Sequence, residues 1–310
     1  MRLTAIDIGT NTILMLIADI APDGTLKTVR DEHVIARLGT GVDRSRAITR
    51  ETIERTLSFL RSYKQISDEC GSERIVACGT SALRDASNRD QFIRLIAEEL
   101  GVGIGILSGD EEAELTYLGA ISEFQKPGKP EYFGVLDIGG GSTELTFGAN
   151  DAVQKKQSLD IGCVRLTERV LKISPPSSLS MSQALNEIRA EVASISSLPS
   201  RTQLIGVAGT LTTLAALDLQ LPTYDPRRVS GHILTFETIQ QIFNQLRIKT
   251  IDEMLVNPQI LPGRADVLLA GIVILMEVMK RLNADRITVS DRGLRYGMAI
   301  RESFAPPPKN

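Results

Sequence analysis

The chain has 310 residues, of which 42% are hydrophobic and 24% are charged, and its formal net charge is −3 at pH 7. This composition is typical of a globular protein, and the length leaves room for two domains. Because 35 basic side chains are balanced by 38 acidic ones, the sequence gives no global basic surface, and nucleic acid is not an expected partner.

The first half of the chain predicts three strands followed by alternating helices and strands. The strands are expected at 2–8, 12–19, 25–36, 74–80 and 104–108. The helices are expected at 49–71, 88–100 and about 110–124, and the first of them has Thr49 as its N-cap and Gly71 as its stop. Helices that follow a mixed sheet in this order indicate the α/β class.

The stretch "QKPGKPE" at 125–131 has the composition of a linker and predicts a boundary between domains at 1–124 and 125–310. After it the order of elements starts again. Strands are expected at 132–138, 143–148 and 152–159, then helices at 162–172 and 181–197, a strand at 203–209, further helices and a strand at 286–290. We expect the last helix, at about 292–304, to pack back on the first domain.

Each half of the chain carries the same strand–turn–strand, "AIDIGTNTILMLIA" and "VLDIGGGSTELTFG". Glycines allow a positive φ and leave backbone N–H groups uncovered, so each turn is a candidate anion site. Side-chain donors can be added by Thr10, Asn11, Thr12, Ser142 and Thr143. The aspartates before the turns, Asp7 and Asp137, would repel an anion, so we expect them to hold a hard cation such as Mg²⁺.

The three cysteines, Cys70, Cys78 and Cys163, are an odd number without metal-ligand spacing, so neither a disulfide framework nor a structural zinc site is expected. Asp7 falls where a signal peptide would need its apolar region. The longest apolar stretch, 267–279, contains Glu277 and is too short to span a bilayer. We therefore expect a cytoplasmic protein without a membrane partner.

Six segments in chain order resemble one known family. They are "AIDIGTNTILMLIA", "GTSALRDASNRDQF", "ILSGDEEAELTYLGA", "LDIGGGSTEL", "GVAGTLTTLAAL" and "SDRGLRYGMA", and they run from residue 5 to 299. The double turn resembles the actin, sugar-kinase and Hsp70 superfamily. The finer pattern is similar to the exopolyphosphatase and guanosine-pentaphosphate phosphatase family.

This resemblance implies two actin-like (ribonuclease H-like) domains, each with a mixed sheet flanked by helices, which face each other across a central cleft. It also implies a set of phosphate-binding residues, namely Gly9, Thr10, Asn11, Thr12, Gly139, Gly140, Gly141, Ser142, Thr143, Gly209 and Thr210. Asp7 and Asp137 are the expected ligands of Mg²⁺, with Mn²⁺ as the other suitable ion.

Three side chains are candidates for the chemistry itself. Arg84 follows a strand and, by the resemblance, is a phosphate ligand suited to bidentate binding. Glu112 takes the place of the family's catalytic glutamate, the base that would activate water. Glu111 is the fallback, because one position along a helix turns a side chain by about 100°. Glu144 is expected either to support the metal and water or to be an ordinary strand carboxylate.

The family usually has Glu where this chain has Tyr296, which puts any role of that carboxylate here in doubt. We expect its segment to be structural. The function implied is a hydrolase of phosphorus-containing acid anhydrides that releases orthophosphate from inorganic polyphosphate, with short chains favoured. Two alternatives stay open, a guanosine pentaphosphate 5'-phosphohydrolase and a non-catalytic polyphosphate or alarmone sensor. The resemblance also leaves a homodimer open.

Overall fold

The computed structural model describes residues 1–21, 23–126, 131–199 and 201–304. The chain forms two compact units, one of Met1–Gly119 with Gly293–Asn310 and the other of Ala120–Arg292. The chain therefore passes between the units twice, after Gly119 and after Arg292.

This division differs from the expected boundary at 124/125. The first unit ends at Gly119, before the proline-rich stretch at 125–131, of which residues 127–130 lie outside the described part of the chain. Helix α5 (Gly109–Ile121) spans the boundary without a break. The change of unit therefore occurs within a regular helix, which has no signal in composition.

The first unit contains a mixed five-stranded sheet in the order β3-β2-β1-β4-β5. Its strands are β1 (Arg2–Ile8), β2 (Ile13–Ile20), β3 (Leu26–Val34), β4 (Arg74–Gly79) and β5 (Ile104–Ile106). Strand β1 pairs antiparallel with β2 and parallel with β4. The helices of this unit, besides most of α5, are α1 (Val42–Ser45), α2 (Arg50–Glu69), α3 (Ser81–Asp85), α4 (Arg89–Leu100) and α13 (Leu294–Ser303).

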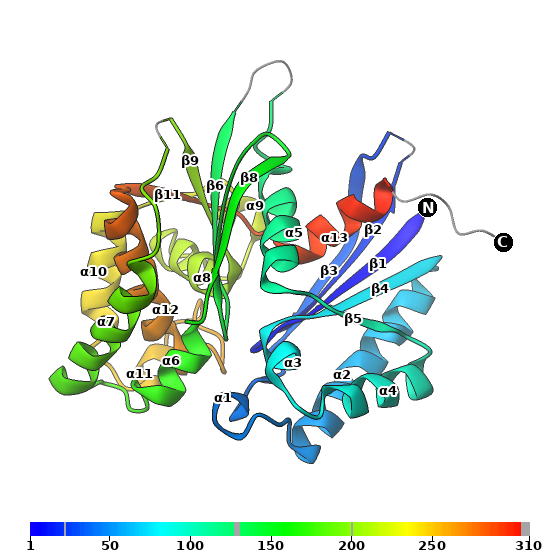
Figure 1. The fold of residues 1–310 in the computed structure, drawn as a ribbon, viewed down its shortest axis with the longest axis horizontal. Helices are drawn as coiled ribbons and strands as arrows, with labels where there is room; N and C mark the ends of the chain where they lie inside the picture. The colour runs from blue at the N-terminus through cyan, green and yellow to red at the C-terminus, as the bar shows by residue number, and fades with distance from the viewer. Residues whose placement is uncertain (22, 127–130, 200, 305–310) are drawn as a thin grey trace. The chain divides into compact units, whose positions relative to one another are not determined.

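Both faces of this sheet are buried. Successive strand residues point to opposite faces, and the apolar residues of the two faces belong to different cores. Ile6, Ile8 and Met15 belong to a core with residues of α2 and α4, on the side where Figure 1 shows these two helices. Leu3 and Leu16 belong to a second core, together with residues of α13. The final helix thus packs on the first sheet.

The second unit contains a mixed six-stranded sheet in the order β10-β11-β9-β6-β7-β8. Its strands are β6 (Tyr132–Ile138), β7 (Thr143–Ala149), β8 (Ala152–Leu159), β9 (Gln203–Val207), β10 (Ile233–Thr235) and β11 (Arg286–Val289). Its helices are α6 (Cys163–Arg169), α7 (Ser178–Val192), α8 (Ala208–Asp218), α9 (Pro226–Val229), α10 (Phe236–Leu246), α11 (Ile251–Leu255) and α12 (Ala265–Leu282). Figure 1 shows α7, α10 and α12 grouped beside this sheet.

The two sheets follow one plan. The order β3-β2-β1-β4 in the first unit matches β8-β7-β6-β9 in the second, with the same parallel and antiparallel pairings. The second strand of each plan carries a register shift, between Ile17 and Ala18 and between Phe147 and Gly148. This repeated mixed sheet with flanking helices confirms the predicted α/β class.

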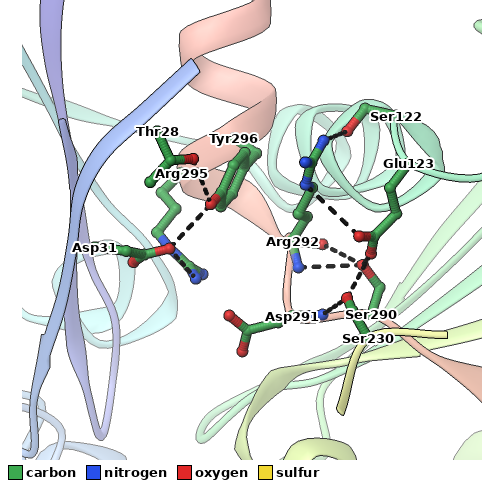
Figure 2. A network of polar contacts seen from close by, with 10 residues as sticks. All are labelled: Thr28, Asp31, Ser122, Glu123, Ser230, Ser290, Asp291, Arg292, Arg295 and Tyr296. Atoms are coloured by element: carbon green, nitrogen blue, oxygen red, sulfur yellow. Dashed lines mark hydrogen bonds and ion pairs between the residues drawn. The ribbon is translucent and has the colours of Figure 1, made fainter. Parts of the chain in front are cut away.

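Helix α13 is fixed to the first unit by polar contacts of two neighbouring residues (Figure 2). Arg295 donates from Nε and Nη2 to the two carboxylate oxygens of Asp31, both at 2.9 Å. The Tyr296 hydroxyl lies 3.1 Å from both Asp31 Oδ2 and Thr28 Oγ1. At the position where the family usually has Glu, a tyrosine therefore completes a structural contact, and a carboxylate there would face that of Asp31.

A second polar cluster, also drawn in Figure 2, lies within the second unit around Glu123. Ser230 Oγ donates to Glu123 Oε1 at 2.7 Å, and Ser290 donates to the same oxygen. The Arg292 guanidinium lies 3.7 Å from Glu123 Oε2. Glu123 thus joins the residues just after one chain crossing to those just before the other.

Within the described ranges, no helix combines the length and apolar character that a membrane span requires.

Candidate functional site

The two predicted turns have the same backbone structure. Gly9 N–H donates to the carbonyl of Thr12 at 3.1 Å, and Gly139 N–H donates to that of Ser142 at 3.0 Å. In each unit the strand residues on either side of the turn are register partners, Ile8 with Ile13 in the first unit and the corresponding pair in the second. The predicted repeat of sequence is therefore a repeat of geometry.

One predicted reason for the glycines, a positive φ, is wrong, because none of those in the turns has φ in the left-handed region. At Gly9 and Gly139 the requirement for glycine is close approach. A Cβ on Gly9 would lie 2.8 Å from the Thr12 carbonyl oxygen, and one on Gly139 would lie 3.0 Å from that of Ser142. Glycine is needed because the chain folds back onto its own carbonyl group.

The first turn is supported by the segment that follows β3. Arg37 N–H donates to the carbonyl of Asn11 at 2.9 Å, and Gly39 N–H donates to that of Thr10 at 2.8 Å. A Cβ on Gly39 would lie 2.2 Å from the Thr10 methyl group, so that glycine is also required by contact. The two middle carbonyls of this turn therefore point toward the supporting segment.

Both predicted metal-binding aspartates lie near the ends of central strands. Asp7 is buried in β1, and Asp137 is half-buried in β6. Asp137 is the register partner of Glu144 on β7, so both carboxylates lie on one face of the sheet, with their Cβ atoms about 4.5–5.5 Å apart. Ser158 Oγ donates to Glu144 Oε1 at 2.7 Å. Two adjacent carboxylates of this kind fit a hard cation.

Thr143 does not have the predicted side-chain role. It is fully buried, and its hydroxyl donates to the carbonyl of Ile161 at 2.6 Å. Because a hydroxyl has a single proton, this bond leaves none for an anion. Thr143 points to the face of the sheet opposite Glu144, as strand alternation requires, and it stabilises the turn from behind.

Arg84 and Glu112, predicted from separate motifs, are in direct contact in the first unit. Arg84 Nη1 lies 3.0 Å from Glu112 Oε2 and donates to the carbonyl of Leu107 at 2.8 Å. Arg84 belongs to the short helix α3 after β4, and Glu112 belongs to the first turn of α5 after β5. Adjacent parallel strands thus deliver a cation and a carboxylate to one place.

The structure distinguishes Glu111 from Glu112. Glu111 Oε2 accepts from Ser108 N–H at 2.9 Å, and Glu111 N–H donates to Ser108 Oγ at 3.2 Å. This reciprocal pair is a capping box, so Glu111 caps the N-terminus of α5. Glu112 is only 8% exposed and faces Arg84. Of the two candidates, Glu112 is the one that is buried against an arginine.

Burial raises the pKa of Glu112 above its ordinary value of 4.5, and the charge and hydrogen bond of Arg84 offset part of that increase. A carboxylate with a raised pKa is a stronger base when ionised. Such a group is better matched to proton transfer near neutral pH than an exposed glutamate.

The Gly209–Thr210 loop begins α8, and Ala208 at its start has φ 72°. This left-handed conformation strains any residue with a Cβ. The Thr210 hydroxyl lies against α12, where a Cβ on Gly271 would be 2.1 Å from it. Thr210 therefore contributes to helix packing with its side chain.

Two arginines near these loops were not among the predicted residues. A Cβ on Gly209 would lie 3.1 Å from Arg264 Cζ, so a guanidinium lies directly against this loop. Burial lowers the pKa of Arg264. Arg165, in α6, donates from Nε to the carbonyl of Gly141 at 2.7 Å. The only sequence signal was "PGRAD" and "GCVRL", in which each arginine lies at the start of a helix.

The predicted residues divide between the two units. Asp7, Gly9–Thr12, Arg84 and Glu112 belong to the first, whereas Asp137, Gly139–Glu144, Gly209 and Thr210 belong to the second. Each unit thus holds one glycine turn that follows an aspartate, and the first also holds the Arg84–Glu112 pair. These are parts suited to binding a phosphate chain and activating water.

Comparison with known proteins indicates the same family that the sequence motifs resemble. The sequence profile described as the Ppx/GppA phosphatase family matches residues 16–303. Exopolyphosphatase 2 of Mycobacterium tuberculosis is 36% identical over 315 residues, which cover 96% of this chain and 98% of that protein. The guanosine-5'-triphosphate,3'-diphosphate pyrophosphatase of Vibrio atlanticus is 28% identical, over 95% of this chain and 58% of that protein.

The fold has solved counterparts. The crystal structure of the Aquifex aeolicus member of the Ppx/GppA family superposes with a TM-score of 0.82 and 34% identity, over 97% of each chain. This similarity confirms the predicted actin-like architecture with two domains. Sequence profile, relatives and fold agree along nearly the whole chain, which therefore belongs to the Ppx/GppA phosphatase family.

Proposed function

We propose that this protein is a metal-dependent exopolyphosphatase that hydrolyses the terminal phosphoanhydride of inorganic polyphosphate and releases orthophosphate. Membership of the family makes it a hydrolase of phosphoanhydrides. The observation that carries the proposal is the buried Glu112 in contact with Arg84, because such a pair combines a base for water with a cation for phosphate.

Polyphosphate is the preferred substrate class because the exopolyphosphatase relative matches this chain over more of its own length than the pyrophosphatase relative does. The Mycobacterium tuberculosis exopolyphosphatase matches this chain along 98% of its own length, whereas the Vibrio atlanticus pyrophosphatase matches along 58% of its length. The second protein nevertheless supports an alternative substrate, guanosine pentaphosphate, whose terminal phosphoanhydride presents the same chemistry. A preference for short polyphosphate chains is part of the proposal.

In the proposed mechanism Glu112 accepts a proton from water as that water attacks the terminal phosphorus in line with the leaving oxygen. Arg84 neutralises charge on the equatorial oxygens through its guanidinium. The backbone N–H groups of the glycine turns, with Thr10, Asn11, Thr12 and Ser142, bind phosphate oxygens. Orthophosphate leaves, and the shortened chain carries the negative charge of the leaving oxygen.

We propose Asp7 in the first unit and Asp137 in the second as metal ligands, with Glu144 as the carboxylate beside Asp137. Among the described residues there is no group of three or more acidic, histidine or cysteine side chains placed to hold a metal. The aspartates proposed as ligands suit Mg²⁺, which binds one or two carboxylates together with water and substrate phosphates. Mn²⁺ accepts the same ligands. When bound, the ion would neutralise negative charge on the substrate phosphates.

A direct test compares orthophosphate release from tripolyphosphate, long-chain polyphosphate and guanosine pentaphosphate with Mg²⁺. We expect the highest kcat/KM with tripolyphosphate and measurable release from the long chain. Release from guanosine pentaphosphate alone would replace the proposed substrate by the alternative. Chelation of the metal should abolish release, and Mn²⁺ should restore part of it.

A further inference from the structure

The carbonyl groups of the second turn all have partners on its supporting side. Cys163 N–H donates to the carbonyl of Gly139 at 2.9 Å. Val164 N–H and Arg165 N–H both donate to that of Gly140, at 2.9 and 3.0 Å. The carbonyl of Gly141 accepts instead from a side chain, Arg165 Nε, at 2.7 Å. Three consecutive carbonyls are thus held toward the start of α6.

These contacts determine where the opposite ends of the same peptides point. In a planar trans peptide the C=O of one residue and the N–H of the next point in opposite directions. The N–H groups of Gly140, Gly141 and Ser142 therefore point away from α6. Within the described residues none of the three donates to another group of the protein. Consecutive N–H groups with a common direction form a concave anion site.

The first turn shows that this support is normally made by backbone. The carbonyl of Asn11, which corresponds to that of Gly141, accepts from the backbone N–H of Arg37. At the corresponding place in the second turn the donor is the guanidinium of Arg165, which is 8% exposed. The orientation of one N–H, that of Ser142, therefore depends on a side chain that can be changed by mutation.

We propose that Arg165 is a positioning residue that orients the Gly141–Ser142 peptide, so that the Ser142 N–H donates to an oxygen of the bound phosphate chain. The inference rests on the proposed function, since it concerns the same phosphate-binding turn. Without the Nε donor the peptide can rotate, and its carbonyl oxygen would then repel the phosphate. The effect should appear in substrate affinity more than in the chemical step, because Arg165 supports a binding turn of the second unit, whereas the proposed base, Glu112, belongs to the first unit.

The test compares two substitutions that match each other in length. Arg165→Gln places its amide nitrogen at the position of Nε and keeps the donor, whereas Arg165→Met places a methyl group there. Binding of tripolyphosphate is measured by calorimetry in the presence of Glu112→Gln, which removes turnover. We expect Arg165→Met to weaken binding about tenfold and Arg165→Gln about threefold or less, because a hydrogen bond to a charged group is lost only in the first.

Arg295→Met serves as the structural control, because Arg295 is equally buried but pairs with Asp31 in the first unit. It should lower the thermal midpoint and leave tripolyphosphate affinity unchanged. If Arg165→Met also lowers only the midpoint, or if Gln and Met have equal affinity, Arg165 is structural and the inference is wrong. When Glu112 is left unchanged, the kinetics of Arg165→Met should show a raised KM and a kcat within a few-fold of the parent enzyme.

Amide hydrogen exchange in the parent protein gives a readout that does not depend on the folding of a variant. Saturating tripolyphosphate should slow exchange at Gly140, Gly141 and Ser142, and unchanged exchange at Ser142 would overturn the inference. The proposed function fails separately, if the protein binds tripolyphosphate with the expected Arg165 dependence but releases no orthophosphate. If the parent enzyme releases orthophosphate but Arg165→Met has unchanged affinity for tripolyphosphate, the inference is rejected and the proposed function is retained.

Discussion

At the residue scale, the environment of Glu112 is set by two opposing effects. Burial raises the pKa of this carboxyl, and the adjacent Arg84 lowers it through charge and a hydrogen bond. Burial is the larger effect. Glu112 is therefore protonated over a wider pH range than an exposed glutamate, and it can act as a base only where it is ionised.

The pH dependence of turnover should report this balance. Since the pKa of Glu112 is raised, the ionised base is lost as pH falls through a value above the ordinary 4.5. The acid limb of kcat/KM should therefore lie above pH 4.5. Arg84→Met removes the effects that lower the pKa, so it should move the limb to higher pH as well as reduce the rate.

The matched control for this profile is Arg61→Met, because Arg61 pairs with Glu99 in the same unit and does not influence Glu112. It should leave the position of the limb unchanged. An acid limb at or below pH 4.5 in the parent enzyme, or one that Arg84→Met moves to lower pH, would contradict the assigned environment.

A second residue-scale prediction concerns Ala208, whose φ of 72° places a Cβ in the left-handed region. Ala208→Gly should raise the free energy of unfolding by about 0.5–1 kcal/mol, because relief of the strain exceeds the added entropy of the unfolded chain. Urea unfolding measures the change. Ala216→Gly, in the interior of the same helix, should instead lose about 1 kcal/mol or more. Equal losses in both variants would show that Ala208 is unstrained.

At the element scale, the turns of the two units are built alike and supported differently. The predicted strands at 2–8, 132–138 and 152–159 have their observed bounds, because each ends beside residues that favour turns. Helices α1 and α3 and strand β10 are too short to show a periodic pattern, and they were not predicted.

The parts of the site that were missed depend on contacts between distant segments. Arg165 contacts Gly141, and Arg264 contacts Gly209, across intervening helices or strands. No spacing rule connects such pairs. The same limit explains the wrong φ predicted for the glycines and the wrong role given to Thr143, because close approach and hydroxyl partners are properties of the packed chain. The turns and the carboxylates were recognisable because their motifs are local.

Helix α13 provides an element-scale prediction whose sign is clear. A Cβ on Gly297 would lie 1.8 Å from the backbone oxygen of Leu115 in α5. Helix propensity alone predicts that Gly297→Ala stabilises by about 1 kcal/mol. We expect it to destabilise by about 1–3 kcal/mol, since a backbone atom cannot move aside as a side chain can.

Thermal and urea unfolding of Gly297→Ala measure this contact. Gly103→Ala is the control, because a Cβ there would meet nothing within 4 Å. It should change the free energy of unfolding by about 0.5 kcal/mol or less. Stabilisation by Gly297→Ala would mean that α13 and α5 are not packed as closely as described.

At the scale of the whole molecule, each unit contains the same mixed sheet and the same turn after an aspartate. The second unit is one continuous segment, whereas the first is completed by α13 after the chain returns at Gly293. The Arg84–Glu112 pair belongs to the first unit only. The repeat therefore supplies the two turns proposed to bind phosphate, and the proposed hydrolytic chemistry comes from a pair of residues that is not repeated.

The measurement that tests this account most directly is turnover and binding of tripolyphosphate by Glu112→Gln beside the parent enzyme with Mg²⁺. The account predicts that orthophosphate release falls by about 10²-fold or more, as removal of a general base requires. Affinity for tripolyphosphate should stay within a few-fold of the parent value, since the binding turns are unchanged. Undiminished release from Glu112→Gln, or equal loss of binding and release, would contradict the assignment of Glu112 as the base.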